Sequence, residues 1–279
     1  MGSIERQEEE RQEDFLHRFW RLAIANVVAN LMVPLAGLID VAILGHLAEI
    51  HHLAGVALAT VLFNYIYWTF GFLRMGTTGM TAQAIGRDDH PAVLLTGLRN
   101  GVLALGIGLT ILVLQQPLRE LGFTLLSATS EVKASGRDYY NTLIWGAPAT
   151  LLNFVLMGWF LGREQSHKVL LLSVVANGTK IGLDYLFIVR WGLQGAGAGL
   201  AGSGSQYLML LVGLLLVLQE IRWEKVQAVA EDLWNPAALK TALVLNGDIL
   251  IRTFALVSTF SLFTNLSSAF GTVILATNT

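Results

Sequence analysis

The sequence contains no cysteine among its 279 residues, and only 14% of the residues are charged. Without cysteine the chain forms no disulfide, no thiolate metal site and no cysteine nucleophile. Its formal net charge of −2 offers no reason to expect a clustered basic face, so we expect no nucleic-acid partner. The HExxH and GxSxG patterns of common hydrolases are also absent. We therefore expect a protein that is not an enzyme and has no cofactor.

What the sequence has in abundance is apolar residues. They make up 54% of the chain, and its mean hydropathy is positive, which is typical of a membrane protein. A helix needs roughly 20 such residues to cross about 30 Å of hydrocarbon. A porin-like barrel is excluded, because its strands are about ten residues of alternating polarity. We predict an all-α polytopic protein in the lipid bilayer of the inner or plasma membrane, with six spans and a seventh helix, near residues 18–45, 53–78, 92–115, 138–162, 168–190, 194–219 and 237–270.

The distribution of Lys and Arg predicts the orientation of these spans. The N-terminal segment and the loops on its side carry ten of them, whereas the loops on the opposite side carry four. Because Lys and Arg are enriched in cytoplasmic loops, we expect a cytoplasmic N-terminus. Residues 1–14 are too acidic for a signal peptide and are predicted to form a cytoplasmic tail. Residues 221–236 are predicted to form a cytoplasmic linker, which ends in the helix-start signal Asn235 and Pro236.

Polar residues interrupt the first span at helical spacing. Asn26, Asn30, Gly37 and Asp40 follow one another at intervals of four, seven and three, so they share one helix face. Pro34 cannot donate a backbone hydrogen bond, which predicts a bend beside this face. The residues alone leave two interpretations open: a bendable helix around a proton or cation site, or a kink that serves packing.

The fifth span repeats this pattern. Ser173, Asn177, Lys180 and Asp184 are spaced by four, three and four residues, so they also share a face. An ionisable group inside a membrane is a functional candidate, since stability alone favours an apolar residue. The alternative is a structural ion pair between Lys180 and Asp184, although lysine N-terminal to the acid is the weaker order.

Two further stretches concern packing and a cavity. Gly195 to Ser205 reads GAGAGLAGSGS, and small residues of this kind let membrane helices pack closely. Polar and aromatic residues of the second span recur on about one face. We consider them candidates for lining a cavity for an organic substrate: Thr60, Asn64, Tyr67, Trp68 and Gly71.

Several sequence motifs on these helices, taken together, resemble those of one protein family. GLIDVAILGHL, YYNTLIWGAPATLLNFVLMGWFLGREQS and GLDYLFIVRWGLQGAGAGLA resemble the multidrug and toxic compound extrusion (MATE) family, in its DNA-damage-inducible protein F branch, over residues 15–270. The resemblance implies a transporter of twelve helices in two six-helix lobes. Residues 15–220 then correspond to the N-lobe and 237–279 to a truncated start of the C-lobe, whose remainder is an expected partner. It also implies export of organic compounds (drugs, toxins or organic acids) by antiport against H⁺ or Na⁺.

The resemblance further implies roles for individual residues. The family's N-lobe cation site corresponds to Asp40 and Asp184, so H⁺, or Na⁺ if it is the coupling ion, is expected there. A bend of helix one is expected at Pro34. The residues expected to complete the polar site are Asn26, Asn30, Asn177 and Lys180. Substrate contacts are expected from Asn64, Tyr67, Trp68, Tyr139 and Asn153.

Four positions depart from the family's pattern. Lys180 stands where Asn is common and Gly202 where Thr occurs, and Leu143 and Gly247 stand where Arg is common. Two aspartates alone carry a charge of −2, which attracts H⁺ or Na⁺, whereas an added ammonium leaves −1. We therefore predict that Lys180 acts as a tethered cation and weakens Na⁺ binding.

Two other functions also fit these residues. A lipid flippase of the same superfamily predicts wide, cationic lateral grooves. A non-transporting membrane scaffold predicts that the buried polar groups only fix helix packing. Replacing Asp40 by Asn separates the scaffold from the antiporter, because only the antiporter loses proton-coupled efflux.

Overall fold

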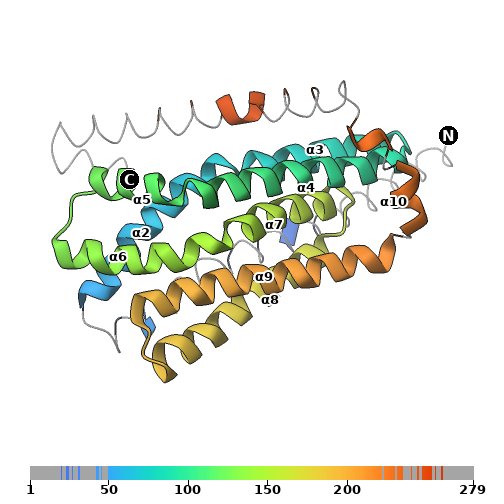
Figure 1. The fold of residues 1–279 in the computed structure, drawn as a ribbon. Coiled ribbons are helices and arrows are strands. Elements are labelled where there is room, and N and C mark those ends of the chain that lie inside the picture. Colours follow the sequence, from blue (N-terminus) through green and yellow to red (C-terminus); the bar gives the residue numbers. More distant parts are fainter. Residues whose placement is uncertain are drawn as a thin grey trace, which may run out of the picture.

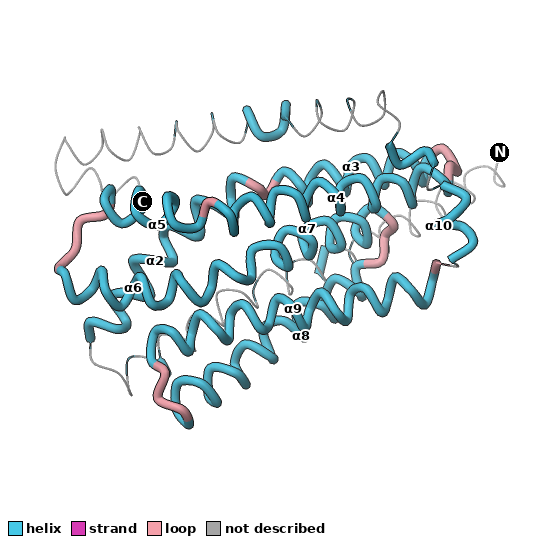
Figure 2. Tube along the Cα trace, viewed as in Figure 1, coloured by secondary structure: helices cyan, strands magenta, loops and turns pink. Residues whose placement is uncertain are grey.

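The computed structural model is a bundle of long helices that run roughly alongside one another (Figure 1). It describes residues 50–221, 223–229, 231–234 and 247–252, with isolated positions between 20 and 45 and between 240 and 259. All regular structure in these residues is helical, joined by short loops (Figure 2). The elements are α2 (Ile50–Thr69), α3 (Phe72–Gly86), α4 (His90–Val113), α5 (Gln115–Leu125), α6 (Ser130–Leu143), η1 (Ile144–Gly146), α7 (Ala147–Gly162), α8 (Ser166–Asp184), η2 (Tyr185–Arg190), α9 (Gln194–Glu220), α10 (Trp223–Val229) and η3 (Glu231–Trp234).

Within the described residues, five helical segments are long and apolar enough to cross a membrane. They match the second to the sixth predicted spans, which confirms those predictions. The first and seventh predicted spans fall mostly outside the described residues, and so do Asn235 and Pro236. The five segments are His51–Gly86, His90–Val113, Ser130–Gly162, Ser166–Arg190 and Gln194–Glu220.

Capping side chains fix where two of these helices begin. The first backbone N–H groups of a helix have no partner inside it, so a side-chain acceptor just before the helix stabilises its start. Asp89 accepts such a bond from the backbone N–H of Ala92 at 3.0 Å, with Pro91 in the first turn of α4. Thr129 accepts from Val132 at the start of α6, at 3.5 Å.

Three of the five membrane segments change their helical form along their length. Gly71 lies between α2 and α3. The 3₁₀ turn η1 joins α6 to α7 just before Pro148, which has no N–H to continue the helical ladder. The Tyr207 hydroxyl on α9 donates to the Trp145 carbonyl in this turn at 2.9 Å, so a neighbouring helix bonds the backbone at the break. The third change is the π-helical η2, which continues α8.

Helices α6 and α9 approach each other through small residues. A Cβ atom added at Gly199 would lie 2.6 Å from the Tyr139 carbonyl oxygen, and one added at Gly146 would lie 2.9 Å from the Ser203 Cα. Contacts this short leave no room for a side chain, so glycine is required at both positions. The predicted role of the 195–205 stretch in close packing is confirmed.

Large aromatic and aliphatic residues fill the interior, whereas leucines cover the outside. Phe123, Tyr140 and Ile144 are almost completely buried in one core cluster. On α9, Leu211 and Leu218 are 54% and 63% exposed. An exposed stripe of leucines is unfavourable in water but matches the hydrocarbon of a bilayer.

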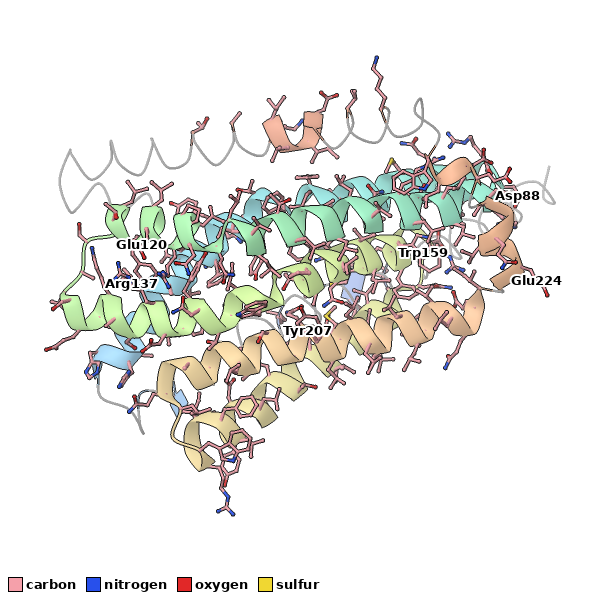
Figure 3. All side chains as sticks on the ribbon, in the orientation of Figure 1. Asp88, Glu120, Arg137, Trp159, Tyr207 and Glu224 are labelled. Atoms are coloured by element: carbon pink, nitrogen blue, oxygen red, sulfur yellow. The ribbon has the colours of Figure 1, made fainter. Side chains whose placement is uncertain are left out.

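Charged residues gather at both ends of the bundle, as the labels in Figure 3 show. At the end marked by Asp88, which we call the Asp88 end, Glu220 accepts from Arg163 at 2.6 Å and also contacts Lys168. The Arg163 guanidinium lies over the Trp159 ring, 4.1 Å from its centroid. Partial burial lowers the pKa of Arg163 from its ordinary value. This group ties the α7–α8 loop to the last turn of α9.

The opposite end, which we call the Glu120 end, has a similar arrangement. Arg119 and Arg137 each lie 2.9 Å from a Glu120 carboxylate oxygen. The Arg137–Glu120 contact joins α6 to α5 across the loop that separates them. Charged networks at both ends of apolar helices indicate water on two sides of the bundle.

The segment after α9 returns to the Asp88 end of α4. The Arg99 guanidinium of α4 donates to the Asp232 carbonyl at 2.6 Å and to the Leu233 carbonyl at 3.4 Å. Val229 of α10 is buried. The described part of the predicted linker is therefore helical and bound to the bundle.

Candidate functional site

Asp184 is the most deeply buried charged group of the described residues. It ends α8, and its side chain is fully buried. The Lys180 ammonium, one turn earlier, donates to Oδ2 of this carboxylate at 2.8 Å, and the Lys180 side chain is 19% exposed. A carboxylate buried alone is strongly destabilising, so the ammonium offsets part of that cost. The ion pair considered from the sequence is thus present.

The other polar residues of the fifth span lie on the same face of α8. The Ser173 hydroxyl donates to the Val169 carbonyl at 2.9 Å, and Asn177 Nδ2 donates to the Ser173 carbonyl at 2.8 Å. Ser173 and Asp184 are both buried, whereas Gly178 and Gly182 between them face open space on the other side. Two members of the predicted stripe, Ser173 and Asp184, therefore lie inward, and the role of the stripe as an ion site stays a prediction.

The helix changes its winding directly after the carboxylate. Tyr185 is the first residue of the π-helical η2. At the end of η2, the Trp191 N–H donates to the Leu186 carbonyl at 3.0 Å. Short π-helical turns inside α-helices occur frequently at functional sites. The wide turn places Asp184 at a junction between two helical forms.

Helix α9 lies beside this junction. A Cβ atom added at Gly204 would be 3.1 Å from Leu183 Cδ1, so α9 passes close to the residue before Asp184. In the same turn of α9, a Cβ atom at Gly202 would be 2.6 Å from Leu143 Cδ1 of α6. The carboxylate thus lies near a region where α9 presents glycines.

A second buried polar contact links α7 to α9. Asn153 is 1% exposed, and its Nδ2 donates to both the backbone carbonyl and the side-chain Oε1 of Gln206, each at 2.9 Å. Sequence reasoning singled out Asn153 but not Gln206, because spacing along one helix does not reveal a partner on another. The only sequence signal was an amide within an apolar span.

The remaining substrate candidates divide between the interior and the surface. The Phe63 ring lies 5.7 Å from that of Tyr67 and 6.2 Å from that of Tyr139, so these two tyrosines belong to one aromatic cluster. Asn64 and Trp68 lie on an exposed face of α2, and Trp68 is 67% exposed. The structure therefore does not bring the five candidates into one group.

Four predicted site residues of the first helix fall outside the described residues: Asn26, Asn30, Pro34 and Asp40. Their roles stay predictions.

Comparison with known proteins decides the family. The family model MatE matches residues 26–186, which is more than half of the chain and includes α2 to α8 up to the first residues of η2. The chain belongs to the MatE family. This confirms the resemblance read from the sequence.

Two curated relatives illustrate how much of a MatE protein this chain covers. It is 34% identical over 260 residues to DNA damage-inducible protein F of Escherichia coli, covering 93% of this chain and 56% of that protein. It is 23% identical over 269 residues to the Shewanella oneidensis protein named Probable multidrug resistance protein NorM, covering 94% of this chain and 58% of that protein. The chain therefore spans about half the length of the curated relatives it matches.

Solved MATE structures share the fold of this chain. One, described as a MATE transporter of the MOP superfamily in an outward-facing conformation, has a TM-score of 0.76 at 21% identity and covers 90% of this chain and 55% of its own. Another, described as MATE in the bent conformation, has a TM-score of 0.76 at 21% identity and covers 93% and 58%. Together with the family match, they identify the bundle as one lobe of a multi-pass membrane transporter fold.

Within this MatE lobe, two departures from the family pattern contact one another. Leu143 and Gly202 were noted separately in the sequence, but the leucine methyl group occupies the space next to Gly202 that a larger side chain would need. The two positions therefore fit one another in shape, and neither carries a polar side chain.

Proposed function

We propose that this chain is the N-lobe of a secondary active antiporter that exports organic compounds in exchange for H⁺ or Na⁺. The observation that carries the proposal is Asp184, a fully buried carboxylate on the inward polar stripe of a membrane helix in a MatE chain. Stability alone favours an apolar residue at such a position, so a carboxylate there supports a transport role. The C-lobe is the partner this function requires.

In the proposed mechanism, cation binding lowers the cost of moving a carboxylate between wet and dry surroundings. Asp40 binds and releases the coupling ion, and Asp184 shares charge with Lys180. The ion-bound and ion-free forms of the carboxylate favour different conformations. An ion gradient therefore shifts the balance between the inward-open and outward-open states. Pro34 allows helix one to bend during this change, and the amides that complete the site are Asn26, Asn30 and Asn177.

The proposed substrate is a small organic molecule held between the two lobes. The exposed face of α2 with Asn64 and Trp68 is suited to line that space, because an aromatic ring and an amide can bind varied organic groups. Tyr67 and Tyr139 lie deeper and belong to the aromatic cluster of Phe63 on α2, whereas Asn153 is buried against Gln206 of α9. We place the Asp88 end in the cytoplasm, because Lys and Arg are enriched on that side in the sequence.

The test is transport by the full-length protein in proteoliposomes under an imposed H⁺ or Na⁺ gradient, followed with a fluorescent organic cation. Asp184→Asn removes the buried charge at nearly constant volume, and we expect gradient-driven transport to fall to the level of empty vesicles. Asp88→Asn is the matched control, since the Asp88 side chain is 93% exposed at one end of the bundle. We expect this variant to transport like the wild type.

The same experiment distinguishes the antiporter from a scaffold. A scaffold is also consistent with the Lys180–Asp184 ion pair and the Asn153–Gln206 contact. If the protein is a scaffold, the wild type and both variants should show no gradient-driven transport. Undiminished transport by Asp184→Asn would show that this carboxylate takes no part in coupling.

A further inference from the structure

The buried carboxylate of this lobe has a counter-charge that belongs to the chain itself. Lys180 Nζ lies 2.8 Å from Asp184 Oδ2, and only one helical turn separates the two residues. We propose that the Lys180 ammonium is the resident counter-ion of Asp184 and excludes Na⁺ from this carboxylate. This inference rests on the proposed coupling role of Asp184 and concerns which ion the site accepts.

The charge balance of the pair supports this role. An ammonium and a carboxylate sum to zero, so an incoming Na⁺ meets no net negative charge from the pair. It also meets a like charge that already occupies one carboxylate oxygen. Like charges at close range in a buried site repel more strongly than in water, because the effective dielectric constant is lower.

Two described positions at the contact of α6 with α9 also bear on metal binding. Hard cations are held by several carboxylate, carbonyl or hydroxyl oxygens. Gly202 supplies no hydroxyl from α9, and the Leu143 methyl group occupies the adjoining space. These two positions offer Na⁺ no side-chain oxygen, so they act in the same direction as the Lys180 ammonium.

A purely structural salt bridge makes a different prediction. Removing the ammonium from a structural pair lowers stability but creates no affinity for a new ion. Removing it from a cation site leaves a buried carboxylate that binds an added cation. The distinguishing readout is therefore Na⁺-specific stabilisation, which a change in packing alone does not produce.

The experiment uses the full-length protein in lipid nanodiscs, with thermal unfolding measured in NaCl and in choline chloride of equal ionic strength. The wild type and Lys180→Arg, which keeps the charge, should unfold at the same temperature in both salts. Lys180→Asn should unfold earlier in choline and recover in Na⁺, with an affinity for Na⁺ at least about tenfold above the wild type by calorimetric titration. The Lys180→Asn, Asp184→Asn double variant should lose this response.

Two outcomes overturn the proposal. One is Na⁺-specific stabilisation of the wild type that Asp184→Asn abolishes. The other is a folded Lys180→Asn protein with no response to Na⁺; Lys180→Gln takes its place if Lys180→Asn does not fold. The Na⁺-binding measurement does not depend on transport. If Lys180→Asn gains Na⁺ binding but the protein moves no organic substrate, the proposed function is refuted and this inference is not.

Discussion

Asn64 and Asn153, two candidates for the substrate cavity, lie in opposite environments. Asn64 is on the exposed face of α2, whereas Asn153 is 1% exposed and donates twice to Gln206 on the neighbouring helix. The same amide is therefore a surface group at one position and a link between helices at the other. The sequence prediction assigned both of them to substrate contact.

This contrast predicts different effects on stability. Asn153→Ala removes two hydrogen bonds in a buried site and leaves the Gln206 side chain without this donor, so it should lower the free energy of unfolding by about 1–3 kcal/mol. Asn64→Ala should change it by less than about 0.5 kcal/mol. Reversible denaturant unfolding in detergent micelles measures both. Equal losses would show that the Asn153 contact adds nothing to stability.

At the scale of elements, apolar length predicted the five described spans well, because a membrane helix must be both long and apolar. It did not predict α5, whose first residues are Gln115 and Gln116 and which is too short and polar to register as a span. The η2 winding was also missed, since no residue type specifies a π turn. The α8 stripe was predictable because it depends only on spacing within one helix. The Asn153–Gln206 and Leu143–Gly202 contacts were not, because they depend on how helices meet.

The helix contacts predict opposite effects for the same substitution at two glycines. Gly199→Ala places a methyl group against α6, where the Tyr139 carbonyl would be 2.6 Å away, and should destabilise the bundle by about 1–3 kcal/mol. Gly182→Ala adds a methyl group where nothing lies within 4 Å, and should be neutral or stabilise α8 by up to about 1 kcal/mol. Thermal unfolding of the two variants compares them directly. A stable Gly199→Ala protein would mean that α6 and α9 can separate at little cost.

At the scale of the whole molecule, the absence of cysteine from these 279 residues gives a direct way to test orientation. Asp88 and Glu131 are both exposed, and they lie at opposite ends of the bundle. In intact cells, a membrane-impermeant maleimide should label Glu131→Cys and leave Asp88→Cys unmodified. Permeabilised cells should label both variants, which controls for accessibility. The reverse pattern in intact cells would place the Asp88 end outside and contradict the orientation inferred from Lys and Arg.

The Lys180–Asp184 contact also has an electrical consequence for the lobe. Carrying one elementary charge through a membrane potential of 100 mV involves about 2.3 kcal/mol of work. Here the two charges cancel and sit one turn apart on the same helix, so tilting or sliding α8 displaces only a small dipole. The membrane voltage therefore does almost no work on α8 through this pair, and any voltage dependence of transport must come from other charges, on the protein or on the transported molecules.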